Sequence, residues 1–135
     1  MAWIFYQTGI LVAPDGVRTP AYSGKGIHKN DPDSQNLPMQ GPLPCGIYHI
    51  GSPFDSPEHG PYVLRLTPDA ANEMFGRAGF LIHGDSKEHP GEASNGCIVA
   101  PRATREQVYL SGDKELHVVA REQTAVAVDP GMETE

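Results

Sequence analysis

Glycine and proline interrupt this chain at close intervals, with 15 glycines and 13 prolines in 135 residues. Both residue types break helices and gather in turns, so long helices have little room between them. The apolar and alternating runs that separate the breaks are short, which is typical of β-strands. Strands are expected at 3–7, 9–13, 17–26, 46–50, 62–66, 80–83, 96–99 and 115–120. This pattern predicts a mainly β fold with one short helix (β-rich α+β), a sandwich or barrel rather than a series of βαβ units.

The remaining segments are expected to form a helix, a helical turn and a long loop. Residues 104–110 are the best helix candidate, with Thr104 as the N-cap. One or two helical turns are expected within 67–75. The stretch 28–46 is rich in Pro, Asn, Asp and Gly, and a loop of this length inside a compact domain is usually functional or mobile.

Length and charge limit the classes of function. A chain of this length predicts one domain, expected here at 1–121, with an acidic, flexible tail at 122–135. The net charge of −7 argues against nucleic acid as a partner, because a phosphate-binding face needs clustered cations. No apolar run reaches the roughly 18 residues of a membrane span. The chain opens directly on a strand-like run, so we expect no Sec signal and synthesis in the cytoplasm.

The stretch 80–101, FLIHGDSKEHPGEASNGCIVAP, places one reactive side chain at the end of each of two apolar runs. His83 follows the first run and Cys97 begins the second. A cysteine thiol is mostly protonated at neutral pH, and a nearby histidine can serve as its base. If the two strands are neighbours, these residues can form a catalytic dyad. Gly96 would let the Gly96 and Cys97 amides face a developing oxyanion, and Ser94 and Asn95 could supply further donors.

Two other interpretations of these residues stay open. The first is a buried, inert cysteine beside a core histidine. The second is a metal site formed by His83, His89 and Cys97, with Asp85 or Glu88 as a fourth ligand, since zinc accepts all of these side chains. The spacing matches no CxxC or HExxH pattern, which argues against metal binding.

Several segments resemble one family of enzymes. HGD at 83–85 and SNGCI at 94–98 resemble the signature of YkuD-type L,D-transpeptidase domains, in which a His precedes Ser-x-Gly-Cys. Residues 41–50, GPLPCGIYHI, resemble the Pro-x-Gly-x-Tyr-x-Ile strand of that family. The segments 22–24 and 77–85 are similar to those of its small type VI secretion effectors. The resemblance covers about residues 1–120 and implies a YkuD-like β-sandwich or barrel.

The resemblance also assigns roles to single residues. It implies that Cys97 is the nucleophile, that His83 is the base, and that the preceding residues shape the oxyanion loop. Asn95 stands where many members have His, and Val99 stands where many have Arg. The role of binding the substrate carboxylate would therefore pass to Arg102 or Arg77. Gly84 and Asp85, in the matching HGD segment, are further candidates for substrate binding. Cys45 is expected to be a free thiol, because a disulfide with Cys97 would remove the nucleophile.

The implied reaction is modification of peptidoglycan without a metal or organic cofactor. The thiol would attack the carbonyl between the L-centre of meso-diaminopimelate and D-Ala in a stem tetrapeptide. Water would then make the enzyme an L,D-carboxypeptidase, and an amine would make it a transpeptidase.

Without a Sec signal, the protein is expected to be a type VI secretion effector that acts in the periplasm of target bacteria, with secretion components and an immunity protein as partners. A metal-dependent hydrolase and a catalytically inactive cell-wall-binding module remain alternatives. A papain-like enzyme is disfavoured, since those enzymes usually place Cys before His.

Overall fold

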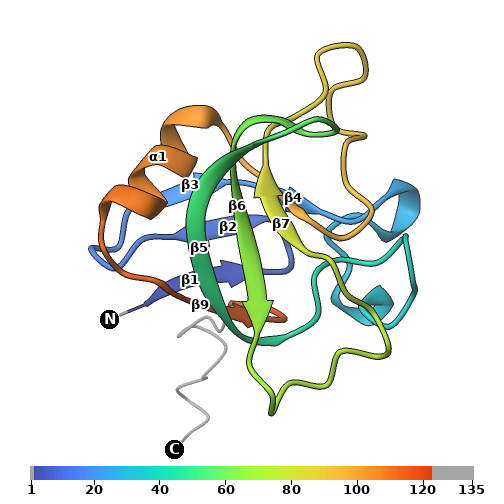
Figure 1. Cartoon of the computed structure of the whole chain (residues 1–135). Coiled ribbons are helices and arrows are strands. Elements are labelled where there is room, and N and C mark those ends of the chain that lie inside the picture. The colour runs from blue at the N-terminus through green and yellow to red at the C-terminus, as the bar shows by residue number, and fades with distance from the viewer. Residues whose placement is uncertain (1, 123–135) are drawn as a thin grey trace, which may run out of the picture.

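The strands of this protein join into one nine-stranded sheet with the order β3-β2-β1-β9-β5-β6-β7-β8-β4. A computed structural model describes residues 2–122 (Figure 1). The strands are β1 (Trp3–Tyr6), β2 (Ile10–Val12), β3 (Arg18–Pro20), β4 (Tyr22–Ser23), β5 (Gly46–Ser56), β6 (Gly60–Pro68), β7 (Leu81–His83), β8 (Ile98–Val99) and β9 (Glu115–Val119). The α-helix α1 spans Arg102–Leu110, and two 3-10 turns span Gly26–His28 and Pro32–Ser34.

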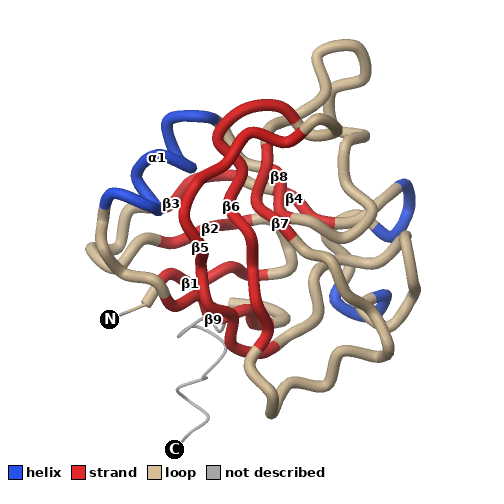
Figure 2. Tube along the Cα trace, viewed as in Figure 1, coloured by secondary structure: helices blue, strands red, loops and turns tan. Residues whose placement is uncertain are grey.

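The sheet curls into a nearly closed barrel. β3 and β4 stand at opposite ends of the strand order, yet only Ala21 separates them along the chain. The two edges must therefore lie close together, and the strands wrap around a common interior (Figure 2). Two pairs, β1 with β9 and β7 with β8, are parallel, and the others are antiparallel. The predicted mainly β fold with one short helix is confirmed.

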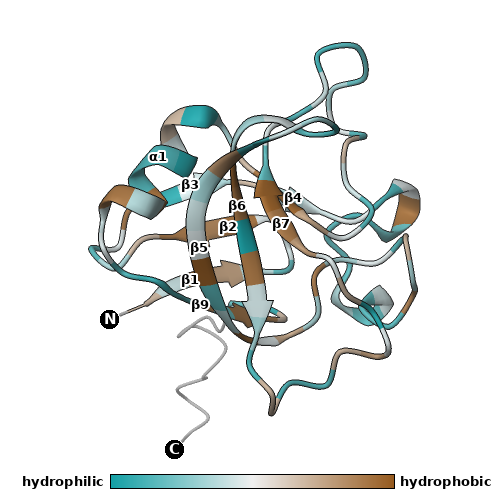
Figure 3. Ribbon diagram, in the orientation of Figure 1, coloured by the Kyte–Doolittle hydropathy of each residue, from teal (hydrophilic) through white to brown (hydrophobic). Residues whose placement is uncertain are grey.

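The inward-facing side chains of the sheet form the hydrophobic core. Figure 3 shows the apolar residues concentrated on the strands, while the connecting loops are mostly polar. The fully buried core side chains include Phe5, Leu43, Tyr48, Leu64, Ile82, Ile98 and Leu116. The helix α1 closes one side of the core with Val108. Burial of each large apolar side chain stabilises the fold by roughly 1.5–3 kcal/mol.

The helix begins two residues before the predicted start. Pro101 is the N-cap and α1 starts at Arg102, so the prediction of Thr104 as the cap is wrong. Thr104 is instead a buried residue of the first turn. The backbone at Pro101 is extended (φ −60°, ψ 156°), and its carbonyl accepts a hydrogen bond from Arg105 N–H, which starts the helix earlier.

The helical turns predicted at 67–75 are absent from the structure, which is a second correction. Thr67 and Pro68 instead continue β6, where Thr67 pairs with His49 of β5. After the strand, the Asn72 side chain bonds to both backbone groups of Ile47. These long-range partners replace a local helix.

The strand expected at 17–26 is also broken at Ala21, because the chain passes there from one edge of the sheet to the other.

The end of the described chain is tied to the sheet. Arg18 of β3 forms a two-bond ion pair with Glu122, one bond being 2.7 Å. The flexible tail predicted at 122–135 lies, from residue 123 onward, outside the described residues. Within the described part, no helix has the length and apolar character needed to cross a membrane.

Candidate active site

His83 and Cys97 lie on the same face of two neighbouring strands. β7 and β8 are parallel, with Ile82 opposite Ile98. This register places Cys97 beside Leu81, and because side chains alternate along a strand, His83 lies one step further along the same face. Ile82 and Ile98 point the other way, into the core. The sheet thus places the two predicted reactive residues on the same face, and within residues 2–122 no hydrogen bond joins them.

His83 is buried, and one of its two ring nitrogens is available. Its Nδ1 lies 2.8 Å from the carbonyl oxygen of Gly84, so Nδ1–H donates to that carbonyl and the proton-free nitrogen is Nε2. Among the described residues, the buried Nε2 has no hydrogen-bond partner. The ring of His59 stacks on the imidazole with centroids 4.2 Å apart. Burial lowers the pKa of His83, and His59 and Arg105 lower it further.

Cys97 is a free, half-buried thiol. Burial raises its pKa, and the backbone of Leu81 and the charge of Arg77 oppose that rise. Both residues are therefore neutral at neutral pH: Cys97 as a protonated thiol and His83 as an unprotonated imidazole. Cys45 is also free, and burial raises its pKa as well.

The turn before Cys97 is held by buried hydroxyl groups. Ser94 Oγ accepts hydrogen bonds from the N–H groups of Gly24 (2.9 Å) and Gly96 (3.0 Å), and it donates to the carbonyl of Cys97 (2.6 Å). Ser23 Oγ donates to the carbonyl of Gly96 at 2.9 Å. The Gly96 amide, expected to face an oxyanion, is thus already bound to Ser94. The Cys97 amide is the remaining backbone candidate for that role.

Gly96 cannot be replaced by another residue without disturbing this turn. Its φ is +142°, and a Cβ there would lie 2.5 Å from a guanidinium nitrogen of Arg77 and 2.9 Å from the ring of Phe80. Both contacts are closer than atoms tolerate. The glycine lets the backbone pass directly over the arginine.

Arg77 anchors the turn from below. Its buried guanidinium donates to four backbone carbonyls, those of Gln35 (2.5 Å), Pro42 (2.8 Å), Gly41 (2.9 Å) and Asn95 (3.3 Å). The first three belong to the long loop at 28–46, so Arg77 ties that loop to the turn of Cys97. An arginine has five N–H donors, and four bonds leave little capacity for the substrate carboxylate that the sequence assigned to it.

Asp85 and Tyr22 shape the loop that follows His83. The Asp85 carboxylate accepts hydrogen bonds from Tyr22 Oη (2.6 Å), Ser86 N–H (2.8 Å) and Gly91 N–H (3.1 Å). Tyr22 Oη in turn accepts from Ala93 N–H at 2.9 Å. Burial and the bond to Asp85 raise the pKa of Tyr22 to about 12, so its hydroxyl stays a donor. These bonds give Asp85 a structural task within its own loop.

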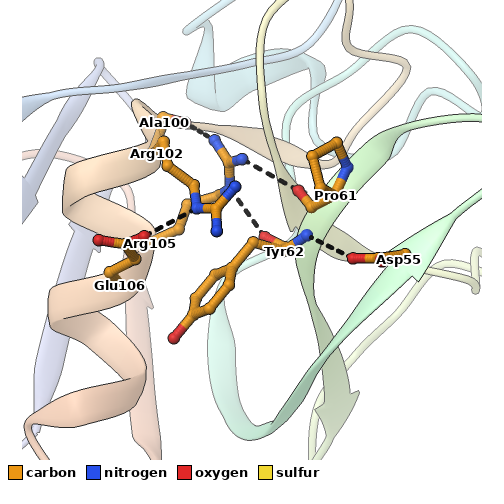
Figure 4. Close-up of polar contacts among 7 residues, drawn as sticks. All are labelled: Asp55, Pro61, Tyr62, Ala100, Arg102, Arg105 and Glu106. Atoms are coloured by element: carbon orange, nitrogen blue, oxygen red, sulfur yellow. Dashed lines mark hydrogen bonds and ion pairs between the residues drawn. The ribbon is translucent and has the colours of Figure 1, made fainter.

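A second buried arginine, Arg105, clamps the other side of the site (Figure 4). It donates to the carbonyls of Tyr62 (2.9 Å), Ala100 (2.6 Å) and Pro61 (3.2 Å), joining α1 to the start of β6 and the end of β8. A Cβ on Gly84 would lie 3.0 Å from Arg105 Nη1. Gly84 therefore leaves room for the clamp directly after His83.

Arg102, the other arginine assigned to substrate, is exposed and paired. Its Nε donates to Glu106 one turn further along α1 (2.9 Å), and its guanidinium lies over the ring of Tyr62 (Figure 4). It borders a cavity of about 580 Å³ together with Tyr22, Asp85 and Val99. This cavity lies beside the strand that carries His83.

Three residues that build the site, His59, Arg105 and Tyr22, were not predicted as site residues from the sequence. His59 lies in the turn between β5 and β6, and Arg105 lies in the middle of α1. Tyr22 lies in a segment that resembles the family, but the resemblance assigned no role to it. Each reaches the site through partners more than 20 residues away, and only the strand register could have revealed them.

The ligands of the metal alternative are not assembled. In residues 2–122, no three His, Cys, Asp or Glu side chains are grouped so that they could hold a metal ion. His83, His89 and Cys97 therefore do not form the predicted triad of ligands in this structure.

The comparison with known families covers most of the chain. Residues 18–124 match the family model of the Tlde1 domain. A search of curated proteins found no match.

Proposed function

The chain belongs to the Tlde1 domain family of type VI secretion effectors that modify peptidoglycan, and on that premise we propose that it is a cysteine-dependent L,D-carboxypeptidase and L,D-transpeptidase. Cys97 is the nucleophile and His83 is its base. One observation carries the proposal: His83 Nε2 is buried, proton-free and without a partner among the described residues, on the face of the sheet that presents the Cys97 thiol. Buried polar atoms normally have partners, so a lone acceptor on the sheet face that also carries a thiol supports a functional role.

The neutral pair supports general-base catalysis. His83 Nε2 takes the Cys97 proton as Sγ attacks the carbonyl that joins the L-centre of diaminopimelate to D-Ala. The imidazolium then gives this proton to the departing amine, the C–N bond breaks, and D-Ala leaves. A thioester joins the stem to Cys97. The bond from Nδ1–H to Gly84 keeps the ring oriented through both transfers.

The second half of the reaction decides the product. His83 takes a proton from the attacking water or amine, the new acyl bond forms, and the Cys97 thiol regains the proton as the thioester breaks. Water yields a tripeptide, whereas a D-amino acid or a second stem yields an exchanged or cross-linked product. The Cys97 amide is the nearest backbone donor for the oxyanion, and the exposed Asn95 side chain is a second candidate.

The proposed place of action is the periplasm of a target bacterium, where mature tetrapeptide stems lie. Delivery requires type VI secretion components, and a producing cell requires an immunity protein against its own toxin. No step of the proposed reaction uses a metal ion, in contrast to a metal-dependent hydrolase.

Mass spectrometry of the reaction products tests the proposal. The purified full chain is incubated with disaccharide tetrapeptide, with and without EDTA. We expect tripeptide and free D-Ala, or exchanged stems when a D-amino acid is added, at the same rate with EDTA. Loss of activity on chelation, together with stoichiometric zinc in the protein, would establish the metal alternative.

Directed expression separates an enzyme from a binding module. Wild type and Cys97→Ala are each fused to a signal peptide and expressed in a Gram-negative host. We expect swelling and reduced cross-linking with wild type only. Equal toxicity of both forms would establish a non-catalytic binding function, and toxicity confined to the cytoplasm would refute the cell-wall assignment.

A further inference from the structure

The face of the sheet that carries Cys97 and His83 also carries an arginine, Arg65. β6 pairs with β7 so that Arg65 lies opposite Leu81, and the register of β7 with β8 places Leu81 beside Cys97. Directly paired residues point to the same side of a sheet. Arg65, Leu81 and Cys97 therefore form one row across three strands.

The Arg65 guanidinium is exposed and has no hydrogen bond or ion pair within residues 2–122. It lies over the ring of Phe54, with Cζ 5.1 Å from the ring centre. Phe54 is opposite Val63, which the register places opposite His83. Gly51 of β5 lies next to Arg65 and has no side chain. A Cβ at this position would lie 3.7 Å from Arg65 Cβ. The aromatic ring thus supports the cation on the reactive face while its donors stay open.

All other arginines in the described chain already have partners. Arg18 pairs with Glu122, Arg102 with Glu106 and Arg121 with Asp33, while Arg77 and Arg105 bind backbone carbonyls. Arg65 is the one guanidinium in residues 2–122 that has neither a hydrogen bond nor an ion pair, so its planar pair of donors is free for a new carboxylate.

The spacing selects one carboxylate of the stem peptide. Two strand spacings separate the Cα atoms of Arg65 and Cys97, roughly 10 Å, and the Arg65 guanidinium lies over Phe54 of β5, on the side of β6 away from β8. The D-Ala carboxylate lies only one residue beyond the attacked carbonyl, about 4 Å away, and a guanidinium directed toward β5 lies farther from Cys97 than that. The carboxylate on the D-centre of diaminopimelate lies at the far end of that residue's side chain and matches the longer span. We propose that Arg65 binds this D-centre carboxylate, an inference that rests on the proposed function.

Binding measurements on an inactive protein test this contact without any turnover. Two disaccharide tetrapeptides are compared by calorimetry, identical except that the D-centre carboxylate is free in one and amidated in the other. The proteins are Cys97→Ala alone and Cys97→Ala combined with Arg65→Gln, Arg102→Gln or Arg121→Gln. We expect Arg65→Gln to weaken binding of the free-carboxylate peptide about tenfold to a hundredfold and to leave the amidated peptide unaffected. Arg121→Gln, an exposed arginine away from this face, should change neither.

Three results would overturn the assignment. They are equal weakening of both peptides by Arg65→Gln, no weakening of either, and loss of discrimination in Arg102→Gln instead. Absence of binding by any of the proteins would also refute it. A different result would show that the proposed reaction is wrong although the Arg65 contact exists. In that case the wild type would leave the tetrapeptide intact, while Cys97→Ala would still distinguish the two peptides. Unchanged thermal unfolding of the exposed Arg65→Gln form confirms that the fold is retained.

Discussion

The core side chains and the predicted reactive side chains of β6, β7 and β8 lie on opposite faces of the sheet. The inner face presents Leu64, Ile82 and Ile98, all fully buried in the core. The outer face presents Arg65, His83 and Cys97 on the same three-strand segment. Because side chains alternate along a strand, residues for stability and residues for chemistry are neighbours in sequence and yet point in opposite directions. Stability and activity should therefore be separable by single substitutions.

Substitution of the outer-face dyad should have the largest effect on activity. Cys97→Ala and His83→Gln are each expected to lower kcat on tetrapeptide by at least about a thousandfold, because nucleophile and base act as a unit. The thermal unfolding midpoint of Cys97→Ala should change little. Cys45→Ala, which removes the other free thiol, is the matched control and should stay active. Near-full turnover by Cys97→Ala would show that Cys97 is not the nucleophile and that the outer face does not carry the chemistry.

Substitution on the inner face should have the reverse effect. Ile82→Ala, between Leu81 and His83, is expected to destabilise the fold by about 2–5 kcal/mol, because it leaves a cavity in the core. In conditions where the variant is still folded, its kcat/KM should stay within several-fold of wild type. Urea unfolding and steady-state kinetics on the same preparation measure both. A large loss of activity in fully folded Ile82→Ala would contradict the separation.

Arg77→Lys should reduce both stability and activity, unlike the substitutions above, because the buried Arg77 supports the reactive face from inside the protein. A lysine cannot reach the four carbonyls that the guanidinium binds. We expect a loss of stability of about 1–3 kcal/mol together with a loss of activity, because the turn of Cys97 loses its anchor. Arg121→Lys is the control on an exposed arginine. Unchanged activity in Arg77→Lys would mean that Ser94 alone holds the turn.

The pH dependence should report the buried state of His83. Burial lowers its pKa below the ordinary value of 6.5, so the unfolded chain binds a proton there more readily than the native protein does. This group's contribution to stability is therefore complete above pH 6.5 and is lost as the pH falls from 6.5 through the lower native pKa. Activity should likewise fall on the acid side only below 6.5, where the base becomes protonated. An acid limb of kcat/KM above 6.5 would contradict a buried, neutral base.

Removal of the stacked ring should have the smallest effect. His59→Gln uncovers His83 and removes a neighbour that lowers its pKa, so the acid limb of kcat/KM should move upward toward 6.5. At pH 8 the rate should remain within several-fold of wild type. His49→Gln, on the same strand pair but away from the site, should leave the pH profile in place. A large loss at pH 8 without a shift of the limb would assign His59 a direct part in the reaction.

The sequence predicted local features well and long-range ones poorly. The positions of His83 and Cys97 at the ends of apolar runs identified both strands, because burial and alternation leave a local pattern. The helical turns at 67–75 were wrong because Thr67 follows its pairing with His49, on another strand. The hydrogen bonds of Arg77 and Arg105 to backbone carbonyls could not be predicted either. Those carbonyls belong to distant segments, and the residue types next to an arginine do not indicate such partners. The contacts of His59 and Arg65 depend on strand register, which the sequence does not display.

The protonated state of Cys97 bears on how long the protein keeps its reactivity. Peroxides and alkylating agents attack the thiolate much faster than the thiol, and oxidation past the sulfenic acid is irreversible. Burial raises the pKa of Cys97, so little thiolate is present at neutral pH in the free protein. The nucleophile is thereby protected from oxidative damage between synthesis and its first encounter with a substrate. In the proposed mechanism, the reactivity of Cys97 arises from transfer of its proton to His83 rather than from a standing anion.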